Sequence, residues 1–373
     1  MLCRVADDLF WMSRYVERAI AVGRLIEVTW HLELDAGDPH DATDFWASLL
    51  GPDRRAQAAA GELQPRDVRR FLAFDRDNPN SLVSCIWRAR GAAQQVREAI
   101  SSEMWEGLNT LHLSLADPKL ASQAEEDPHT FYKRIREGAQ YFEGLAESTM
   151  ARDEEWHFLC LGRYLERVDN VARVLLLKAP LLLSPDRAGT DRPGGGDDTV
   201  RWLAVLRSCG AAEAYSRYYS MRIEPARVVE FLLLNPIFPQ SVRFSLDAAG
   251  DALDAISGLR TRHSELSDPS VRALGQLRSR LEFTAVDEIL VEGLEPFLAD
   301  VQHRIHTVSE RVTAGYLRDE PQPGRLVAVA RAAMIMAAQQ QQQQRADVQP
   351  AWGRPALDEP TSYEPARQSR RRA

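Results

Sequence analysis

The sequence predicts an all-α protein, a helical bundle built from two tandem copies of one multi-helix unit. Three observations predict this fold. Apolar residues recur every three or four positions along most of the chain, few segments alternate apolar and polar residues as strands do, and an eleven-residue motif occurs twice. With 373 residues, of which 45% are hydrophobic, the chain can bury a large core.

Helical periodicity is clearest in six segments. In the first, Leu9, Met12 and Val16 begin a series of apolar residues spaced by three and four, which places them on one face of a helix. Two turns that contain proline end in Ser81 and Ser241 before apolar runs, so both serines are expected to cap helices. The six segments predicted as helices are residues 9–26, 82–100, 131–149, 158–177, 242–256 and 297–316.

The repeated motif reads RYVERAIAVGR from Arg14 and RYLERVDNVAR from Arg163. A second pair of segments, residues 66–81 and 226–241, also matches, but with a larger spacing. A Gly/Pro/Asp-rich loop insertion at residues 184–199 would explain most of the difference. A helix pair or triplet of this kind cannot bury its apolar faces alone, so both copies are expected to share one bundle.

These matches divide the chain into three parts. The first copy covers residues 1–150 and the second covers residues 151–318, and Trp46 and Trp202 are a further candidate pair of equivalent positions. Residues 319–373 are expected to form a linker, a short helix and a tail rich in Gln, Pro and Arg. The composition of that tail is typical of disordered segments.

The composition excludes several classes of protein. A net charge of −8 argues against a nucleic-acid-binding surface. The apolar stretches are too short to span a membrane and the N-terminus lacks the pattern of a secretory signal, so a cytoplasmic protein without membrane contact is expected. Widely spaced cysteines predict free thiols in place of a disulfide framework or a zinc site. These cysteines are Cys3, Cys85, Cys160 and Cys209.

The sequence has no recognisable motif for catalysis or for binding a cofactor. It contains no phosphate-binding loop, no nucleophile elbow and no pair of catalytic Cys and His. Glu154 and His157 have the spacing of half a di-metal site in a helical bundle, but the candidates for the second half are poor. We therefore expect no metal and no cofactor, and the sequence favours a chain without catalytic activity of its own.

The charged residues of the motif form one stripe on a helical wheel, opposite its apolar residues. Because the stripe is partly buried, its charges must be paired. Glu17 would meet Arg14 within its own helix, or Arg167 across a pseudo-twofold interface. Reciprocally, Glu166 would meet Arg18. Alternatively, the arginines in excess of the two glutamates would bind a carboxylate or a phosphate.

Both interpretations concern the same candidate residues. They are Arg14, Tyr15, Glu17, Arg18, Arg24, Arg163, Tyr164, Glu166, Arg167, Asp169, Asn170 and Arg173. A secondary candidate lies in residues 85–109, where two arginines seven positions apart would share one helix face, although a solvated charged face explains them as well. Its residues are Arg90, Arg97, Glu103, Trp105 and Asn109.

Four separated segments of the chain read MLCRVADDLFWMSRYVERAIAVGRLIEV, NPNS, REAISSEMWEGLN and DEEWHFLCLGRYLERVDNVARVL, in this order. Together they resemble the bacterial Alpha-E domain, an all-helical family named for its Glu-Arg motif. The resemblance covers residues 1–317, and it implies a tandem helical duplication. In the first copy Ile20 and Ala21 stand where the family has an acidic residue and Asn, whereas the second copy keeps both, so the polar half of any site should come from the second copy.

The resemblance also implies a functional context. Family members are encoded beside, or fused to, circularly permuted ATP-grasp ligase-like proteins, transglutaminase-like proteases and proteasome-like NTN-hydrolases. We therefore expect a non-catalytic helical partner or substrate-presenting subunit of a peptide synthesis or modification system. Its expected partners are an ATP-grasp ligase-like protein and a transglutaminase-like protease. The alternative is an enzyme domain or small-ligand binder whose paired Glu-Arg stripes bind a carboxylate or phosphate group.

Overall fold

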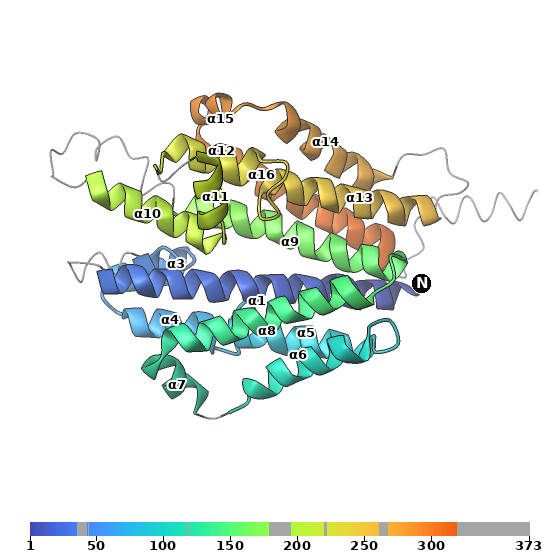
Figure 1. Ribbon diagram of the computed structural model, residues 1–373, viewed down its shortest axis with the longest axis horizontal. Helices are drawn as coiled ribbons and strands as arrows, with labels where there is room; N and C mark the ends of the chain where they lie inside the picture. The colour runs from blue at the N-terminus through green and yellow to red at the C-terminus, as the bar shows by residue number, and fades with distance from the viewer. Residues whose placement is uncertain are drawn as a thin grey trace, which may run out of the picture. The chain divides into compact units, whose positions relative to one another are not determined.

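Two long helices, α1 and α9, form the centre of the fold (Figure 1). The computed structural model describes residues 1–35, 43, 45–117, 119–178, 195–219, 222–260 and 268–318, and every regular element within them is helical. Helix α1 comprises Cys3–Asp35 and α9 comprises Glu154–Lys178, and the two pack against each other. The predicted all-α class is confirmed.

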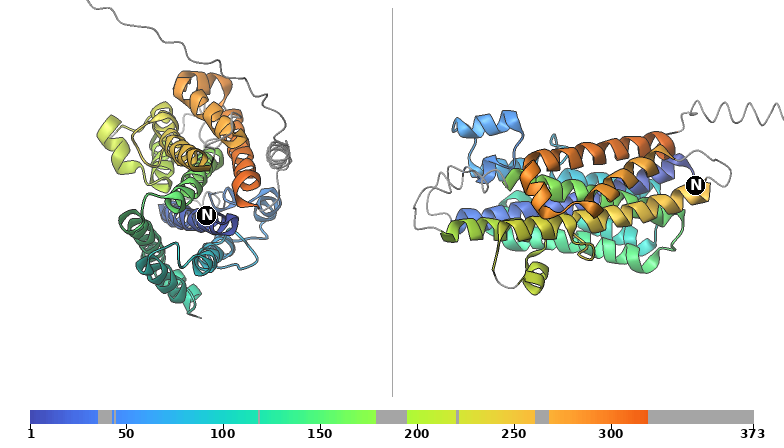
Figure 2. Two further views of the ribbon diagram at one scale, coloured as in Figure 1. Left: turned by 90° about the vertical axis from the view of Figure 1, so that its right-hand side faces the viewer. Right: turned by 90° about the horizontal axis from the view of Figure 1, so that it is seen from above.

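The helices between α1 and α9 in sequence pack mainly on one side of this central pair (Figures 1 and 2). Helix α1 packs against α4, α5 and α8, while α6 and α7 pack against α8. These helices are α3 (Pro52–Ala59), α4 (Pro65–Ala73), α5 (Leu82–Gln95), α6 (Ser102–Ser114), α7 (Leu120–Glu126) and α8 (Pro128–Thr149).

The helices after α9 pack mainly on the other side (Figure 1). Helix α9 packs against α10, α13 and α16, and α14 packs against both α13 and α16. Helix α16 continues into a π-helical turn, η3, which packs back on α1. These elements are α10 (Gly195–Ser208), α11 (Ala212–Tyr219), α12 (Pro225–Leu234), α13 (Val242–Arg260), α14 (Pro269–Phe283), α15 (Val286–Glu292), α16 (Leu294–Val312) and η3 (Thr313–Leu317).

All six predicted helices are present, but the one predicted over residues 82–100 ends too late. Helix α5 stops at Gln95, because Val96 leaves the helical conformation with φ −118° and ψ 29°. After a short turn, the side chain of Ser101 accepts a hydrogen bond from the backbone N–H of Met104 and so caps a separate helix, α6. The periodicity did not distinguish one long helix from two helices joined by a turn.

The predicted loop at residues 184–199 is also too long at its C-terminal end. Helix α10 begins at Gly195. Glycine is tolerated at a helix N-terminus, where the first backbone N–H groups have no partner within the helix in any case. The remainder of this loop lies outside the described residues, as does the expected linker, helix and tail at residues 319–373.

The two predicted capping serines are confirmed. Ser81 Oγ accepts a hydrogen bond from the backbone N–H of Ser84 at 3.2 Å, and Ser241 Oγ accepts one from Phe244 at 3.1 Å. They start α5 and α13, which are the helices that flank α1 and α9. Each cap therefore fixes where a flanking helix begins beside the central pair.

A continuous apolar core connects the helices of residues Met1–Asp319, which form one compact unit. Its largest fully buried side chains include Trp46 and Trp202, which are 0% and 1% exposed. Core residues come from α1, α9 and the helices on both sides of them. None of the helices within the described residues combines the length and the hydropathy needed to cross a membrane.

Helices α1 and α9 approach each other closely at Gly162. A Cβ atom at this position would lie 2.2 Å from the carbonyl oxygen of Phe10 and 2.4 Å from Ser13 Oγ. Both distances are well below van der Waals contact, and a backbone carbonyl inside a helix cannot rotate away. The absence of a side chain at Gly162 therefore sets the spacing at which the motif residues of the two helices can meet.

Replacing Gly162 by alanine should force α1 and α9 apart and destabilise the protein by about 1–3 kcal/mol, as overpacking of a close-packed interface does. Gly144, exposed on α8, is the matched control because a Cβ atom there would meet nothing within 4 Å. Gly144→Ala should instead stabilise its helix by up to about 1 kcal/mol. Urea unfolding measures both variants, and equal midpoints would contradict the close approach.

Candidate functional site

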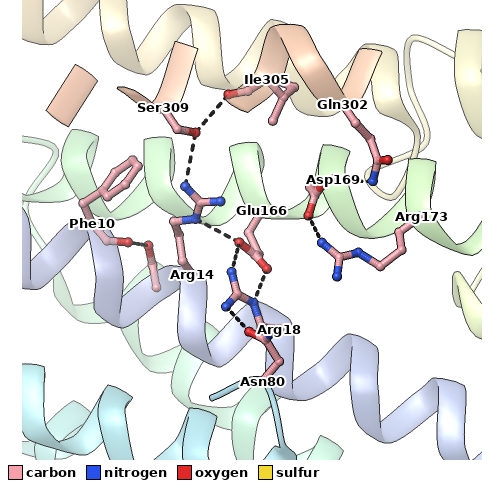
Figure 3. A network of polar contacts seen from close by, with 11 residues as sticks. Phe10, Arg14, Arg18, Asn80, Glu166, Asp169, Arg173, Gln302, Ile305 and Ser309 are labelled. Carbon is pink, nitrogen blue, oxygen red and sulfur yellow. Dashed lines mark hydrogen bonds and ion pairs between the residues drawn. The ribbon is translucent and has the colours of Figure 1, made fainter. Parts of the chain in front are cut away.

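Glu166 of α9 is fully buried at the interface with α1, at the centre of a polar network (Figure 3). Its Oε2 accepts hydrogen bonds from Arg14 Nε at 2.8 Å and from Arg18 Nη2 at 2.9 Å. Its Oε1 accepts a third from Arg18 Nε at 2.6 Å. Arg14 also donates to the hydroxyl of Ser309 in α16 at 3.2 Å. Two guanidinium groups of α1 therefore hold both oxygens of this carboxylate.

Glu17 of α1 is held reciprocally from α9. The Nε and Nη2 atoms of Arg167 donate to its two carboxylate oxygens at 2.8 Å and 2.7 Å. The expected pairs across the interface, Glu17 with Arg167 and Glu166 with Arg18, are thus confirmed. The expected contact of Arg14 with Glu17 inside α1 is not formed. Arg14 binds Glu166 instead, and Arg167 already occupies both oxygens of Glu17.

Two of these arginines also reach the turns that precede the flanking helices. Arg18 Nη1 donates to Asn80 Oδ1 at 2.7 Å, in the turn before α5. Arg167 Nη1 donates to the carbonyl oxygen of Pro239 at 3.3 Å, in the turn before α13. The network therefore connects the central pair to one flanking helix on each side.

The network keeps its two central glutamates ionised. Burial alone would raise the pKa of Glu166, but the charges of Arg14 and Arg18 outweigh burial and lower this pKa to about 2. Burial is likewise outweighed at Glu17, whose pKa is lowered by Arg167. Buried ion pairs are tolerated when both partners are well hydrogen-bonded, as these are. At the centre of the two motifs, the charges therefore form a closed ion-pair network.

Glu143 of α8 makes the network asymmetric. Its Oε1 is buried 3.6 Å from Arg167 Nη2 and has no hydrogen-bond partner among the described residues. Burial, followed by the negative charge of Glu17, raises the pKa of Glu143 to about 7. Near neutral pH, Glu143 therefore exists in both protonation states, and its protonated carboxyl can donate to the carboxylate of Glu17. Sequence reasoning missed this residue because it lies outside both motifs.

Arg163 and the two motif tyrosines border the network through ring contacts. The guanidinium of Arg163 lies 4.9 Å from the ring centre of Tyr164, and that of Arg18 lies 6.0 Å from the ring centre of Tyr15. Arg163 Nε is buried without a hydrogen-bond partner among the described residues. The Nη2 atom of Arg163 donates to Cys160 Sγ at 3.6 Å and to the hydroxyl of Tyr164 at 3.5 Å.

The C-terminal ends of the two motifs differ. Arg173 Nη2 donates to Asp169 at 2.6 Å, and Asp169 also accepts a hydrogen bond from Gln302 at 3.0 Å (Figure 3). Arg24 is the equivalent arginine of the first motif, but Ile20 stands one turn before it in place of an acidic residue. The structure gives Arg24 no hydrogen bond or ion pair with any described residue.

A small cavity lies beside Glu17, between Arg24 of α1 and Asn170 of α9. The Nδ2 atom of Asn170 is buried and has no hydrogen-bond partner within the described part of the chain. The candidate residues of the two motifs thus fall into two groups. Those at the motif centres satisfy one another, whereas Arg24 and Asn170 border the cavity with unsatisfied donors.

The secondary candidate residues do not share one helix face as predicted, because α5 ends before Arg97. Arg90 donates from α5 to Asn109 of α6 at 3.0 Å. The guanidinium groups of Arg90 and Arg97 lie 5.3 Å and 4.9 Å from the ring centre of Trp105. Glu103 is exposed in the first turn of α6. Four of the five residues thus form a contact that holds α5 against α6.

Within the described residues, one group with the geometry to hold a metal ion is Glu27, His31 and His129, whose ligand atoms lie within 4.8 Å of one another. His129 Nδ1 lies 2.9 Å from Glu27 Oε1, and Arg136 also pairs with Glu27. The i, i+4 spacing of Glu27 and His31 was visible in the sequence, but only folding brings α8 to them. Glu154, considered above for a metal, instead pairs with the terminal amine at 3.0 Å.

Comparison with known proteins identifies the region that contains this network. A family model named Alpha-E, described as a predicted alpha-helical domain with a conserved ER motif, matches residues 1–317. Uncharacterised proteins from Mycobacterium tuberculosis (strain H37Rv) and Mycobacterium bovis are each 25% identical over 325 residues. The match covers 81% of this chain and 35% of each relative, so the chain spans about a third of their length. No solved structure matches it.

Removal of the central carboxylate should be costly. Glu166→Ala should destabilise the protein by roughly 3–5 kcal/mol, because Arg14 and Arg18 would stay buried without a counterion. Glu125→Ala is the matched control, since it removes an exposed partner of Arg66 and should cost less than about 1 kcal/mol. Thermal and urea unfolding measure both, and a cost for Glu166→Ala as small as that of the control would refute the buried network.

The raised pKa of Glu143 predicts a loss of stability with increasing pH. Its neutral form contributes stability fully below the ordinary value of 4.5, and this contribution is lost as the pH rises through about 7. Glu143→Gln mimics the neutral carboxyl, so it should exceed the wild type in stability by about 1 kcal/mol or more at pH 8.

The measurement is the unfolding free energy between pH 5 and pH 8.5. Glu137→Gln, at an exposed position on the same helix, serves as the control and should follow the wild-type pH profile. If Glu143→Gln also follows that profile, burial and the charge of Glu17 do not hold the carboxyl of Glu143 neutral.

Proposed function

This chain belongs to the Alpha-E family, and we propose that it acts as a non-catalytic helical partner or substrate-presenting subunit in an ATP-grasp-linked system of peptide synthesis or modification. The principal partner in this proposal is a circularly permuted ATP-grasp ligase-like protein, with a transglutaminase-like protease as a further one. The family resemblance provides this functional context. The motif residues support it because they bind one another inside the protein.

The closed ion-pair network is the observation that carries the proposal. Glu17 and Glu166 are each occupied by guanidinium groups from the opposite helix, and Glu166 is inaccessible to solvent. A general acid or base, or an anion-binding arginine, must be free to meet a substrate. The residues that carry the family motif are instead used to hold α1 against α9, which is the role expected in a scaffold.

The length of the relatives supports a function exerted together with other protein segments. This chain accounts for 35% of each mycobacterial relative, so most of each relative lies outside the matched region. Linkage in one chain places two domains at a high effective concentration, and separate chains must replace that linkage by binding. A stable helical bundle is well suited to present such a binding surface.

We also propose that the bundle arose by tandem duplication of one multi-helix unit. Helix α1 packs against α5 and α8, and α9 packs in the same way against α13 and α16. Arg18 reaches the turn before α5, as Arg167 reaches the turn before α13. Glu143 and Ser309 occupy the same position counted from the starts of α8 and α16, and each approaches an arginine of the network.

A cytoplasmic location is part of this proposal, and the cysteines support it. All four are free, and three of them are buried. Burial raises the pKa of both Cys85 and Cys209 to about 12, which suppresses the reactive thiolate form. Buried, unreactive thiols without a disulfide are typical of proteins in a reducing compartment.

The alternative, a ligand site on the paired stripes, is less well supported at the motif centres. Arg14, Arg18 and Arg167 already donate to buried carboxylates, so a ligand would have to displace an internal partner. Arg24 and Arg163 have no such partner among the described residues, but Arg163 donates to Cys160 and Tyr164, whereas Arg24 borders a cavity. This difference restricts the alternative to the end of the first motif.

The proposal predicts that this chain and a circularly permuted ATP-grasp protein from the same genome form a complex, which size-exclusion chromatography with light scattering can detect. ADP release should require the ATP-grasp protein and should not occur with this chain alone, because the sequence lacks a phosphate-binding loop. An ATP-grasp protein of unpermuted topology is the control. Absence of a complex, or ATP turnover by this chain alone, would count against the scaffold role.

A further inference from the structure

The small cavity beside the network has features that the ion pairs do not explain. It lies where α1 and α9 meet the end of α10, has a volume of about 20 Å³ and opens partly to solvent, so it has room for one small polar group. Its walls combine apolar side chains with polar ones. The polar lining residues are Glu17, Arg24, Arg167, Asn170, Ser208 and Gln240.

Arg24 brings a positive charge to this cavity that no described residue neutralises. The carboxylate that acts on it, Glu17, is already bound through both oxygens by Arg167. Arg136 and Arg167 add further positive charge nearby. Burial lowers the pKa of Arg24, but a guanidinium remains protonated even so. The partly buried cation therefore lacks a counterion.

Two further polar groups on the cavity wall lack partners. Asn170 Nδ2 and Ser208 Oγ are buried, and neither has a hydrogen-bond partner in the described part of the chain. Ser208 is only 4% exposed. A buried polar group left unsatisfied costs roughly 1–3 kcal/mol. Donors from three helices thus border one cavity without an acceptor, which indicates that an acceptor from outside the chain completes it.

The turn after α10 lies close to the guanidinium of Arg24. Gly210 in this turn has φ 63°, a conformation that favours glycine, and a Cβ atom there would lie 2.9 Å from both Cζ and Nη1 of Arg24. The negative end of the α10 dipole compensates part of the charge of Arg24. No hydrogen bond joins Arg24 to this described turn, however, so the guanidinium is positioned but its donors remain available.

The second motif shows how the chain satisfies the equivalent arginine. Arg173 is bound by Asp169, one turn before it on the same helix. In the first motif Ile20 takes the place of that aspartate and contributes an apolar wall to the cavity. An external carboxylate at Arg24 would therefore supply the group that Asp169 supplies at Arg173.

We propose that this cavity binds the carboxylate group of a small ligand, with Arg24 as the charged partner and Asn170 and Ser208 as hydrogen-bond donors. The charged lining residues are Glu17, Arg24 and Arg167, which sum to +1. This sum matches a singly charged carboxylate better than a doubly charged phosphate, and the apolar walls also disfavour the higher charge. The inference does not depend on the proposed ATP-grasp partnership.

Sodium acetate, titrated at constant ionic strength, tests the site. Acetate should raise the thermal unfolding midpoint of the wild type saturably, because a ligand that binds only the folded state stabilises it. Arg24→Gln should weaken acetate binding roughly 10- to 100-fold, the usual effect of losing a charge-assisted contact. Ile20→Asp should weaken it similarly, because the new carboxylate one turn before Arg24 would occupy the guanidinium.

Arg173→Gln is the matched control, since Arg173 is exposed and already paired, and it should keep the wild-type response. The site would be supported if Arg24→Gln loses the acetate response while Arg173→Gln keeps it. Equal midpoint shifts in both variants and the wild type would show a general salt effect and overturn it. A stronger response of the wild type to inorganic phosphate than to acetate would overturn the assignment of a carboxylate.

Discussion

Two carboxylates, Glu17 and Glu166, lie between α1 and α9, and each takes its guanidinium partners from the opposite helix. Desolvating an ion pair costs several kcal/mol per charge, and only well-formed geometry offsets it. The pairs of Glu17 with Arg167 and of Glu166 with Arg14 and Arg18 can form together only when the two helices are rotated so that their charged faces meet. The flanking helices follow from this arrangement, because Arg18 and Arg167 extend from the pairs to the turns where α5 and α13 begin. The buried charges thus specify how the bundle is assembled around its centre.

The sequence contained enough information for the helical class, the capping serines and the pairs across the interface. Periodicity and capping depend on neighbours in the chain, and the cross-pairs followed from applying a twofold relation to a repeated stripe. Glu143 could not be predicted, because its raised pKa arises from burial between helices and then from the carboxylate of Glu17 on another helix. The division of residues 82–100 into two helices depends on a turn at Val96 that the apolar period does not reveal. The group of Glu27 with His129 likewise exists only once α8 packs against α1.

The two motifs have the same central residues but different surroundings. The arginines that lack a carboxylate partner lie where these surroundings differ. Arg14 is completed by Ser309, whereas Arg163 lies near the titrating carboxyl of Glu143. Arg173 has Asp169, whereas Arg24 faces a cavity. Groups that matter only for assembly can be satisfied in the same way at both motifs. A function specific to one motif is therefore to be sought at the positions where the two motifs differ.

The close approach at Gly162 also has a mechanical consequence. With a backbone carbonyl of α1 seated against the bare Cα of α9, the two helices cannot slide past each other without a collision, and a shift of even one residue, about 1.5 Å, would also stretch every central ion pair. The central pair therefore resists sliding, and a rearrangement of the bundle would cost least in helices that do not take part in this contact.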